Sequence, residues 1–265
     1  MQNLFIYFCC KKISFINTNF IAMKKLFIFN WMPIFFAVMA TFSFTACGGG
    51  DGDDTDYAAI AAMQGALGGG TGGSMLDSRI VDLGLSVKWA SCNVGATAPE
   101  EYGGYYAWGE TEEKSDYSWS TYKYCNGIPT SITKYCTSST YGIVDNKTTL
   151  EPADDVATVK WGSNWRIPTK AEIDELRNNC TWQWTTLNGV DGYRVTGPNG
   201  NSIFLPAAGR LGSEVNYRGS MGFYRSSSLD SSYSYETYYL FFYSIHYGGG
   251  NSDRNCGHTV RPVCP

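Results

Sequence analysis

Few residues in this 265-residue chain could take part in catalysis or metal binding. The only histidines are His246 and His258, which are too few for a typical zinc site. No Gly-x-Ser-x-Gly motif occurs, and neither histidine stands beside a nucleophile and an orienting carboxylate. The paired acids Glu112–Glu113 and Asp154–Asp155 are better explained as solvated or helix-start residues. We therefore expect no enzyme activity, no cofactor, no catalytic residue and no metal ligand.

The residue composition of the C-terminal stretch favours ligand binding. From Ser213 to Pro265 the chain is crowded with Tyr and Ser but has no Lys, Gln or Trp. Tyrosine rings supply rigid contact area and hydroxyls supply adaptable hydrogen bonds, a combination typical of recognition surfaces. An ordinary β-rich segment of an exported protein would share this composition, so that alternative stays open.

Residues 238–247 have the side-chain alternation of a strand. Leu240 and Phe242 are expected to face the core, and the residues between and beyond them to face outward. The outward positions are Tyr239, Phe241, Tyr243 and Ile245. A monomer normally avoids an outward row of apolar rings unless it binds something, so we expect a ligand-binding face here. Burial of both strand faces is the alternative.

The elements that position this stretch begin after an export signal. Residues 23–46 contain two lysines, an apolar run to Ala40 and small residues before Cys47, in the order of a signal peptide. The run is short for a membrane span. The junction before Cys47 resembles a lipobox, which implies cleavage there, acylation of Cys47 and membrane contact through that lipid only. Residues 1–22 have no role in this scheme and are assigned to a spurious extension, with an unusually long signal as the alternative.

A linker separates the anchor from the domain. Residues 47–78 are rich in Gly, Asp and Ala and have too little apolar area to order themselves, which predicts a flexible tether. The acidic residues behind Cys47 resemble the surface-export signal of Bacteroidetes lipoproteins, which implies an outer-membrane lipoprotein that faces the exterior. Residues 79–265 are long enough for one domain with its own core. The net charge of -4 includes no basic block, so nucleic acid is not an expected partner.

Six cysteines fall within this domain, and an even number in an exported chain suggests disulfides. No two of them have C-x-x-C spacing, and their pairing stays open. Cys125 and Cys136 could pin a loop to itself. Cys256 and Cys264 are better explained as structural than as a redox pair. The full set is Cys92, Cys125, Cys136, Cys180, Cys256 and Cys264.

The remaining patterns predict an α+β domain with strands on either side of two helices. Residues 81–90 alternate as one strand with a buried face, and residues 103–109 form a short aromatic strand. Residues 110–149 are polar and form a long loop region. Another hairpin is expected over residues 189–206, around a Gly-Pro-Asn-Gly turn. A β-type run over residues 259–263 ends the chain.

Each helix has a start signal. The first begins at Glu151–Pro152, because proline suits a first turn and acidic residues suit the helix dipole. Val156, Ala157 and Val159 would carry it. The second begins with a capping box formed by Thr169 and Glu172. Its apolar positions are Ile173, Leu176 and Cys180.

Five blocks carry a resemblance to a known family: VDLGLSVKWA (81–90), YYAWGE (105–110), WRIPT (165–169), FLPAAG (204–209) and VRPV (260–263). They resemble the Fibrobacter succinogenes major paralogous domain, a family of Bacteroidetes surface lipoproteins, in order and over essentially all of residues 79–265. The resemblance implies a C-type-lectin-like fold with paired terminal strands, two helices and a C-terminal antiparallel sheet whose long loops present a ligand. Relatives of that fold include formylglycine-generating enzymes and the variable proteins of diversity-generating retroelements.

The retroelement relationship implies a sharper hypothesis. Such systems turn AAC codons into NNC codons, which never encode Lys, Glu, Gln, Trp or Met, so Met221 and Glu236 would be fixed. Family members often read Tyr-Trp-Ser-Ser where this chain reads Tyr-Arg-Ser-Ser at 224–227, which implies a ligand-facing Arg225. The implied ligand-binding set is Tyr224, Arg225, Asp230, Ser232, Tyr233, Tyr235, Tyr239, Phe241, Tyr243, Ile245 and His246.

Three functions remain as hypotheses. The protein is a retroelement-diversified binder, a fixed-specificity adhesin or glycan-binding lipoprotein, or, least favoured, a formylglycine-generating-like enzyme. The ligand is an unknown protein or glycan at the cell surface. The Glu-Pro-Asn and Gln-Pro-Asp tripeptides of calcium-dependent lectins are absent, so no calcium requirement is expected. A near-identical repeat that differs only at adenines, beside a reverse transcriptase gene, would support diversification, and an invariant segment without a repeat would exclude it.

Overall fold

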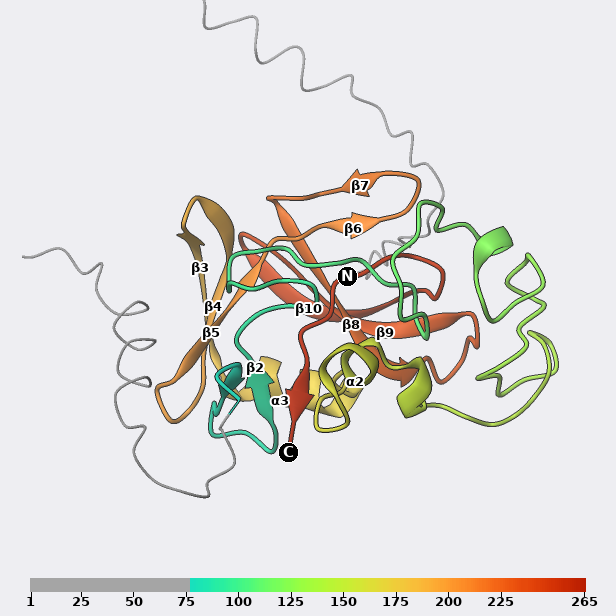
Figure 1. The fold of residues 1–265 in the computed structure, drawn as a ribbon, viewed down its shortest axis with the longest axis horizontal. Coiled ribbons are helices and arrows are strands. Elements are labelled where there is room, and N and C mark those ends of the chain that lie inside the picture. Colours follow the sequence, from blue (N-terminus) through green and yellow to red (C-terminus); the bar gives the residue numbers. More distant parts are fainter. Residues whose placement is uncertain (1–76) are drawn as a thin grey trace, which may run out of the picture. The chain divides into compact units, whose positions relative to one another are not determined.

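The computed structural model describes residues 77–265, which form an α+β domain with its two ends joined (Figure 1). The short strands β1 (Ile80–Val81), β2 (Lys88–Ala90) and β11 (Val263–Cys264) form one sheet in the order β1-β2-β11. Strand β2 pairs antiparallel with both neighbours, and Trp89 lies opposite a residue of each. The expected pairing of the termini is confirmed.

The expectation of one continuous strand over residues 81–90 is wrong, although its burial pattern is right. Pairing stops after Val81 and resumes at Lys88, while Leu83 is fully buried. A Cβ on Gly197 would lie 2.0 Å from the carbonyl oxygen of Leu83, so this loop packs directly against the β4–β5 turn. Asn199 donates to the carbonyl of Asp82 at 2.8 Å. Tertiary packing therefore produces the alternating burial of residues 81–90 without a continuous strand.

The aromatic segment 103–109 is also not a strand. It forms a single bridge, in which Tyr106 exchanges backbone hydrogen bonds with His258. Between β2 and η2 (Pro152–Asp154), the structure has only the three-residue helix η1 (Trp119–Thr121) and isolated bridges, as a long loop region predicts.

The long loops are held by a buried carboxylate and not by a disulfide. Cys125 and Cys136 are free, so the expected pin between them is absent. Instead, Asp154 accepts hydrogen bonds from the hydroxyls of Tyr124 and Tyr135 and from Lys134. Burial opposes the charge of Asp154, but these donors outweigh it and hold the pKa of that carboxyl well below its usual range.

The sequence leaves the pairing of the other cysteines open, and no two of the domain's six cysteines are bonded to each other. Cys264 is free, so it is not bonded to Cys256, and Cys92 and Cys180 are free as well. Burial raises the pKa of the Cys180 thiol to about 11, which makes it a weak nucleophile.

Two α-helices lie in the middle of the domain as expected, but the predicted start of the first at Glu151–Pro152 is wrong, because Pro152–Asp154 forms the short helix η2 and the α-helix begins at Val156. Helix α2 (Val156–Trp161) is capped by the Asp155 carboxylate, which accepts from two backbone N–H groups of the first turn. Val156 and Ala157 are buried, but Val159 is exposed and does not carry the helix.

Helix α3 (Lys170–Asn179) carries the predicted capping box. The Thr169 hydroxyl accepts from the backbone of Glu172, and the Glu172 carboxylate accepts from the backbone of Thr169. Ile173 and Leu176 are buried on its inner side, and Cys180 stands at its C-cap. A capped end and one apolar face are sufficient to dock this short helix.

Three antiparallel strands, β3 (Thr181–Leu187), β4 (Val190–Thr196) and β5 (Ser202–Pro206), follow in the order β3-β4-β5. The β4–β5 hairpin agrees with its turn signal. Strand β3 is not expected from the sequence patterns above, although Trp182 and Trp184 alternate with polar residues and both pack edge-on against Tyr193.

The C-terminal part consists of a small ribbon and a long sheet. Strands β6 (Arg210–Leu211) and β7 (Val215–Asn216) form the ribbon. Strands β8 (Met221–Leu229), β9 (Glu236–Tyr243) and β10 (His246–Asp253) form the sheet in the order β10-β9-β8, with β9 in the centre.

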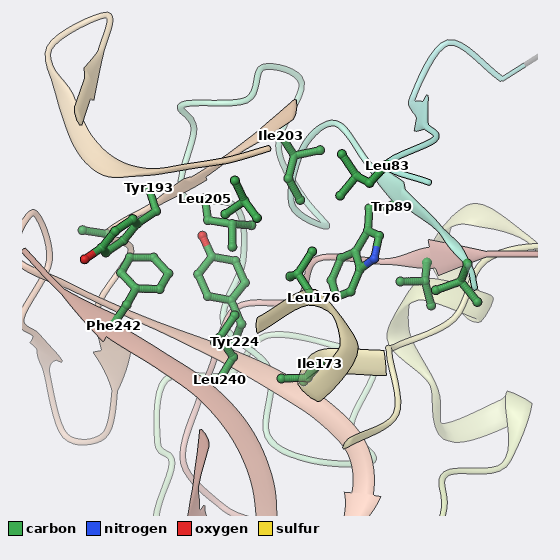
Figure 2. Packing of buried hydrophobic residues seen from close by; sticks show 14 residues of the cluster. Leu83, Trp89, Ile173, Leu176, Tyr193, Ile203, Leu205, Tyr224, Leu240 and Phe242 are labelled. Atoms are coloured by element: carbon green, nitrogen blue, oxygen red, sulfur yellow. The ribbon is translucent and has the colours of Figure 1, made fainter. Parts of the chain in front are cut away.

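One face of the C-terminal sheet forms much of the main hydrophobic core (Figure 2). Tyr224, Leu240 and Phe242 lie on this inner face and are buried, which confirms the inward assignment of Leu240 and Phe242. Figure 2 shows Phe242 beside Tyr193 of β4, and Ile173 of α3 near Leu240. The β3–β5 sheet and α3 therefore cover Leu240 and Phe242 on the inner face, and a cavity of about 170 Å³ remains between α3 and Tyr238 and Gly249.

Candidate ligand-binding face

The outer face of the C-terminal sheet carries a chain of neighbouring rings. The ring of Phe223 lies 5.9 Å from Tyr239, and Tyr239 lies 5.9 Å from Phe241, centroid to centroid. His246 lies 5.6 Å from Phe241 and 5.6 Å from Tyr243. We call these five residues the aromatic row. They come from β8, β9 and the start of β10, so the row crosses the sheet.

Glycines on β10 make room for these rings. In the register of the sheet, Gly248 lies opposite Phe241 and Gly250 lies opposite Tyr239. A Cβ at Gly248 would meet the Phe241 ring at 3.1 Å, and one at Gly250 would meet the Tyr239 ring at 3.1 Å. The rings therefore extend over glycine backbone, which no β10 side chain covers at these two positions.

The aromatic row is open at one end only. His246 is exposed and Phe241 and Tyr243 are half-buried, whereas Phe223 and Tyr239 are 5% and 7% exposed. The expectation that Tyr239 faces solvent is therefore wrong.

The C-terminal segment is the physical cause of this burial. It runs parallel to β8 at Thr259 and bonds to the edge of that strand, and the ring of His258 lies 5.2 Å from Tyr239 and 5.8 Å from Phe223. Burial first, and then the charges of Arg225 and Arg210, hold the pKa of His258 well below its usual range, so this imidazole is neutral.

Ile245 lies outside the row. It is 85% exposed at the tip of the β9–β10 hairpin, where the strand alternation ends. Its side chain is therefore available to a ligand, but not as part of the strand face from which it was predicted.

Arg225 is an interior residue, so the expectation that it faces a ligand is wrong. It is 1% exposed, and its guanidinium donates to the Thr237 hydroxyl at 2.7 Å and to the carbonyl of Cys256. Burial lowers the pKa of Arg225 to about 9. Arg225 thus fills a buried position as a hydrogen-bonded cation.

Tyr224 and Asp230 are interior residues too. The Tyr224 hydroxyl donates to the carbonyl of Pro206 at 2.7 Å on the inner face of the sheet. Asp230 accepts from the backbone N–H groups of Ser232 and Tyr233, each at 2.8 Å, and shapes the loop between β8 and β9. Both residues are 3% exposed, so they support the surface and do not contact a ligand.

The remaining predicted residues form a second group at the other end of β9. Tyr233 and Tyr235 lie 6.3 Å and 5.2 Å from the ring of Tyr141, and Tyr233 is 40% exposed beside the exposed Ser232. We call the three tyrosines the tyrosine triad. Strand β9 separates the triad from Tyr243 by about 20 Å. The predicted site is thus two surfaces and not one.

Several residues beside these surfaces escaped the sequence reasoning. Phe223 is two residues from Arg225, so strand alternation could have placed it on the outer face. Tyr217 and Arg210, which adjoin Phe223, belong to the short β6–β7 ribbon and its flank, where no periodicity is long enough to reveal them. Tyr141 comes from the distant loop region and gives no local signal.

Residues 77–265 contain neither a metal-binding cluster nor a membrane-spanning helix. No group of three or more His, Cys, Asp or Glu side chains there is placed to hold a metal ion. None of the helices in that range has the length and apolar character needed to cross a membrane. The predicted spurious extension, the predicted signal peptide, Cys47 and the predicted linker up to residue 76 lie outside the described residues.

Comparison with known proteins adds no family assignment: no protein-family model, curated protein or solved structure matches this chain.

Glu236, which follows Tyr235 of the tyrosine triad, has a carboxyl group with a raised pKa. Burial first, and then the negative charges of Asp253 and Asp230, raises its pKa from 4.5 to about 7. The folded chain therefore holds this proton more tightly than the unfolded chain. The stabilising contribution is complete below pH 4.5 and is lost as the pH rises through about 7.

We predict that the stability of the wild-type protein falls relative to that of Glu236→Gln between pH 5 and pH 8. The glutamine amide of the variant is uncharged at every pH, so the variant does not lose stability in this way. Urea midpoints measured across that range test the prediction, with Glu214→Gln in the exposed β6–β7 turn as the control. Parallel curves for the wild type and Glu236→Gln would show that Glu236 does not titrate in this window.

Proposed function

We propose that the protein is a surface lipoprotein with a C-type-lectin-like fold that binds a ligand on the open end of its aromatic row. The observation that carries the proposal is that Phe241, Tyr243 and His246 keep their rings partly in solvent at the β9–β10 hairpin, whereas Leu240 and Phe242 on the other face of β9 are buried in the core. Exposed rings on a rigid sheet lose little conformational entropy on binding. The paired termini, the two central helices and the C-terminal antiparallel sheet support the fold assignment.

The burial of several predicted residues favours a fixed specificity over retroelement diversification. Substitution of Tyr224, Arg225, Asp230 or Tyr239 would change interior packing and buried hydrogen bonds as well as the surface. Random replacement at such positions destabilises most proteins. We therefore prefer the fixed-specificity adhesin or glycan-binding lipoprotein, and invariant codons at these four positions among isolates would agree with it.

The affinity for a ligand should depend on the open end of the aromatic row and not on the tyrosine triad. We predict that Phe241→Ala and His246→Ala each weaken binding by about tenfold or more, as truncation of a contact hot spot does. Ligands would be selected with the full wild-type chain on a glycan array and a display of surface proteins, and their affinities measured by calorimetry.

Tyr233→Ala provides the matched control, because it removes a partly exposed ring from the other end of β9. If a selected ligand loses affinity with Tyr233→Ala but not with Phe241→Ala or His246→Ala, the binding face has been assigned to the wrong end of the sheet.

Membrane attachment in this proposal depends on the lipid at Cys47. We predict that Cys47→Ser moves the protein from the outer-membrane fraction to the soluble periplasmic fraction, because no thiol remains to be acylated. Fractionation and a labelled fatty acid measure this directly. Retention of Cys47→Ser in the membrane would contradict the lipid-anchor assignment.

A further inference from the structure

The aromatic row continues into a positively charged flank. The ring of Tyr217 lies 6.1 Å from Phe223, and the guanidinium of Arg210 lies 5.5 Å from the Phe223 ring and 5.8 Å from the Tyr217 ring. Arg210 is half-buried, and Tyr217 is 44% exposed. The ribbon thus adds a ring and a cation to the side of the row opposite β10.

Arg210 has no negative partner within residues 77–265. None of the ion pairs there includes it, and its described contacts are the two rings. Its neighbour Arg218 differs, because that guanidinium donates to the Tyr105 hydroxyl at 3.1 and 3.2 Å. Arg210 therefore keeps a planar set of donors that suits a carboxylate.

The outer surface has the form of a strip. From Arg210 it crosses β8 and β9 to His246, a span of roughly 15 Å at the usual spacing between strands. Its exposed members lie at its two ends, with Arg210 and Tyr217 on the ribbon side and Phe241, Tyr243 and His246 beside the β9–β10 hairpin, and Phe223 is buried between them. A protein partner normally covers about 800 Å² on each side, which such a strip does not supply by itself. An extended chain of flat rings fits it better.

We propose that the ligand of the aromatic row is a glycan that contains a sugar acid, with its carboxylate on Arg210 and neighbouring sugar rings stacked on Tyr217 and Phe241. This inference rests on the proposed function and adds the ligand class. The apolar face of a pyranose ring can stack on an aromatic side chain without a metal. The carboxylate supplies the negatively charged partner that Arg210 lacks within residues 77–265, and its two oxygens fit the planar donors of the guanidinium.

The test uses the full chain in detergent and three soluble probes: trigalacturonate, a glucuronate-terminated disaccharide and sialyllactose. Each probe is paired with its methyl ester, which keeps the sugar rings and removes the charge. We expect at least one acid to bind in calorimetry and its ester to bind about tenfold or more weakly. Arg210→Gln should produce the same loss for the acid and leave the ester unchanged.

Two variants separate this role from a general effect of charge or folding. Arg218→Gln removes an equal charge whose guanidinium is already bonded, and it should leave binding unchanged. Arg210→Lys keeps the charge but loses the planar donors, and it should bind more weakly than the wild type. Thermal unfolding of each variant establishes that it is folded before its affinity is read.

The outcomes distinguish this inference from the proposed function. Equal binding of acid and ester, with loss in Phe241→Ala, would overturn the sugar acid and keep the binding face. Binding of none of the probes would overturn the sugar-acid class, while a selected protein that depends on Phe241 would preserve the face. If no ligand of any class depends on Phe241 or His246, the proposed function itself fails.

Discussion

Three fully buried arginines connect the loop-rich half of this domain to its sheet, and their need for acceptors governs the architecture. Arg225, Arg254 and Arg261 are each at most 1% exposed. A buried guanidinium is costly unless its donors are satisfied. Arg254 donates to the carbonyls of Lys134 and Ser234, among others, and Arg261 donates to carbonyls that include those of Ala90 and Phe204. Segments far apart in the sequence are therefore fixed by hydrogen bonds where the apolar core does not reach.

The course of the C-terminal segment follows from these bonds and determines which part of the sheet stays open. Because Arg254 and Arg261 hold this segment at both ends, His258 is pressed against Phe223 and Tyr239. The inner end of the aromatic row is buried as a result. Only the end next to the β9–β10 hairpin and the flank at Arg210 remain accessible, so the proposed binding surface depends on what covers the sheet as well as on the sheet itself.

Local patterns in the sequence predict the elements with a physical start or stop, and fail where contacts between distant segments decide. The capping box at Thr169 and the turn before Ser202 were interpreted correctly, because each is a local hydrogen-bonding device. Alternation placed Leu240 and Phe242 inside, but it could not reveal that His258 covers Tyr239. The codon argument grouped Arg225 with surface positions. Its burial could not be predicted in this way, because the buried charge depends on hydrogen-bond acceptors from Thr237 and Cys256. Composition indicated a binding surface, and the structure divides it between two ends of one strand.

The proposed binding depends on a division of β9, which packs one face into the core and leaves part of the other open. Comparison of Phe242→Ala with Phe241→Ala tests it, because the two phenylalanines are adjacent in β9 and differ in the face they occupy. Phe242 is fully buried, so its truncation should lower the free energy of unfolding by about 3–5 kcal/mol. Phe241→Ala should lower it by about 1 kcal/mol or less, as a partly exposed site does. Equal losses for the two variants in urea titrations would show that both faces of β9 belong to the core and that neither is open for binding.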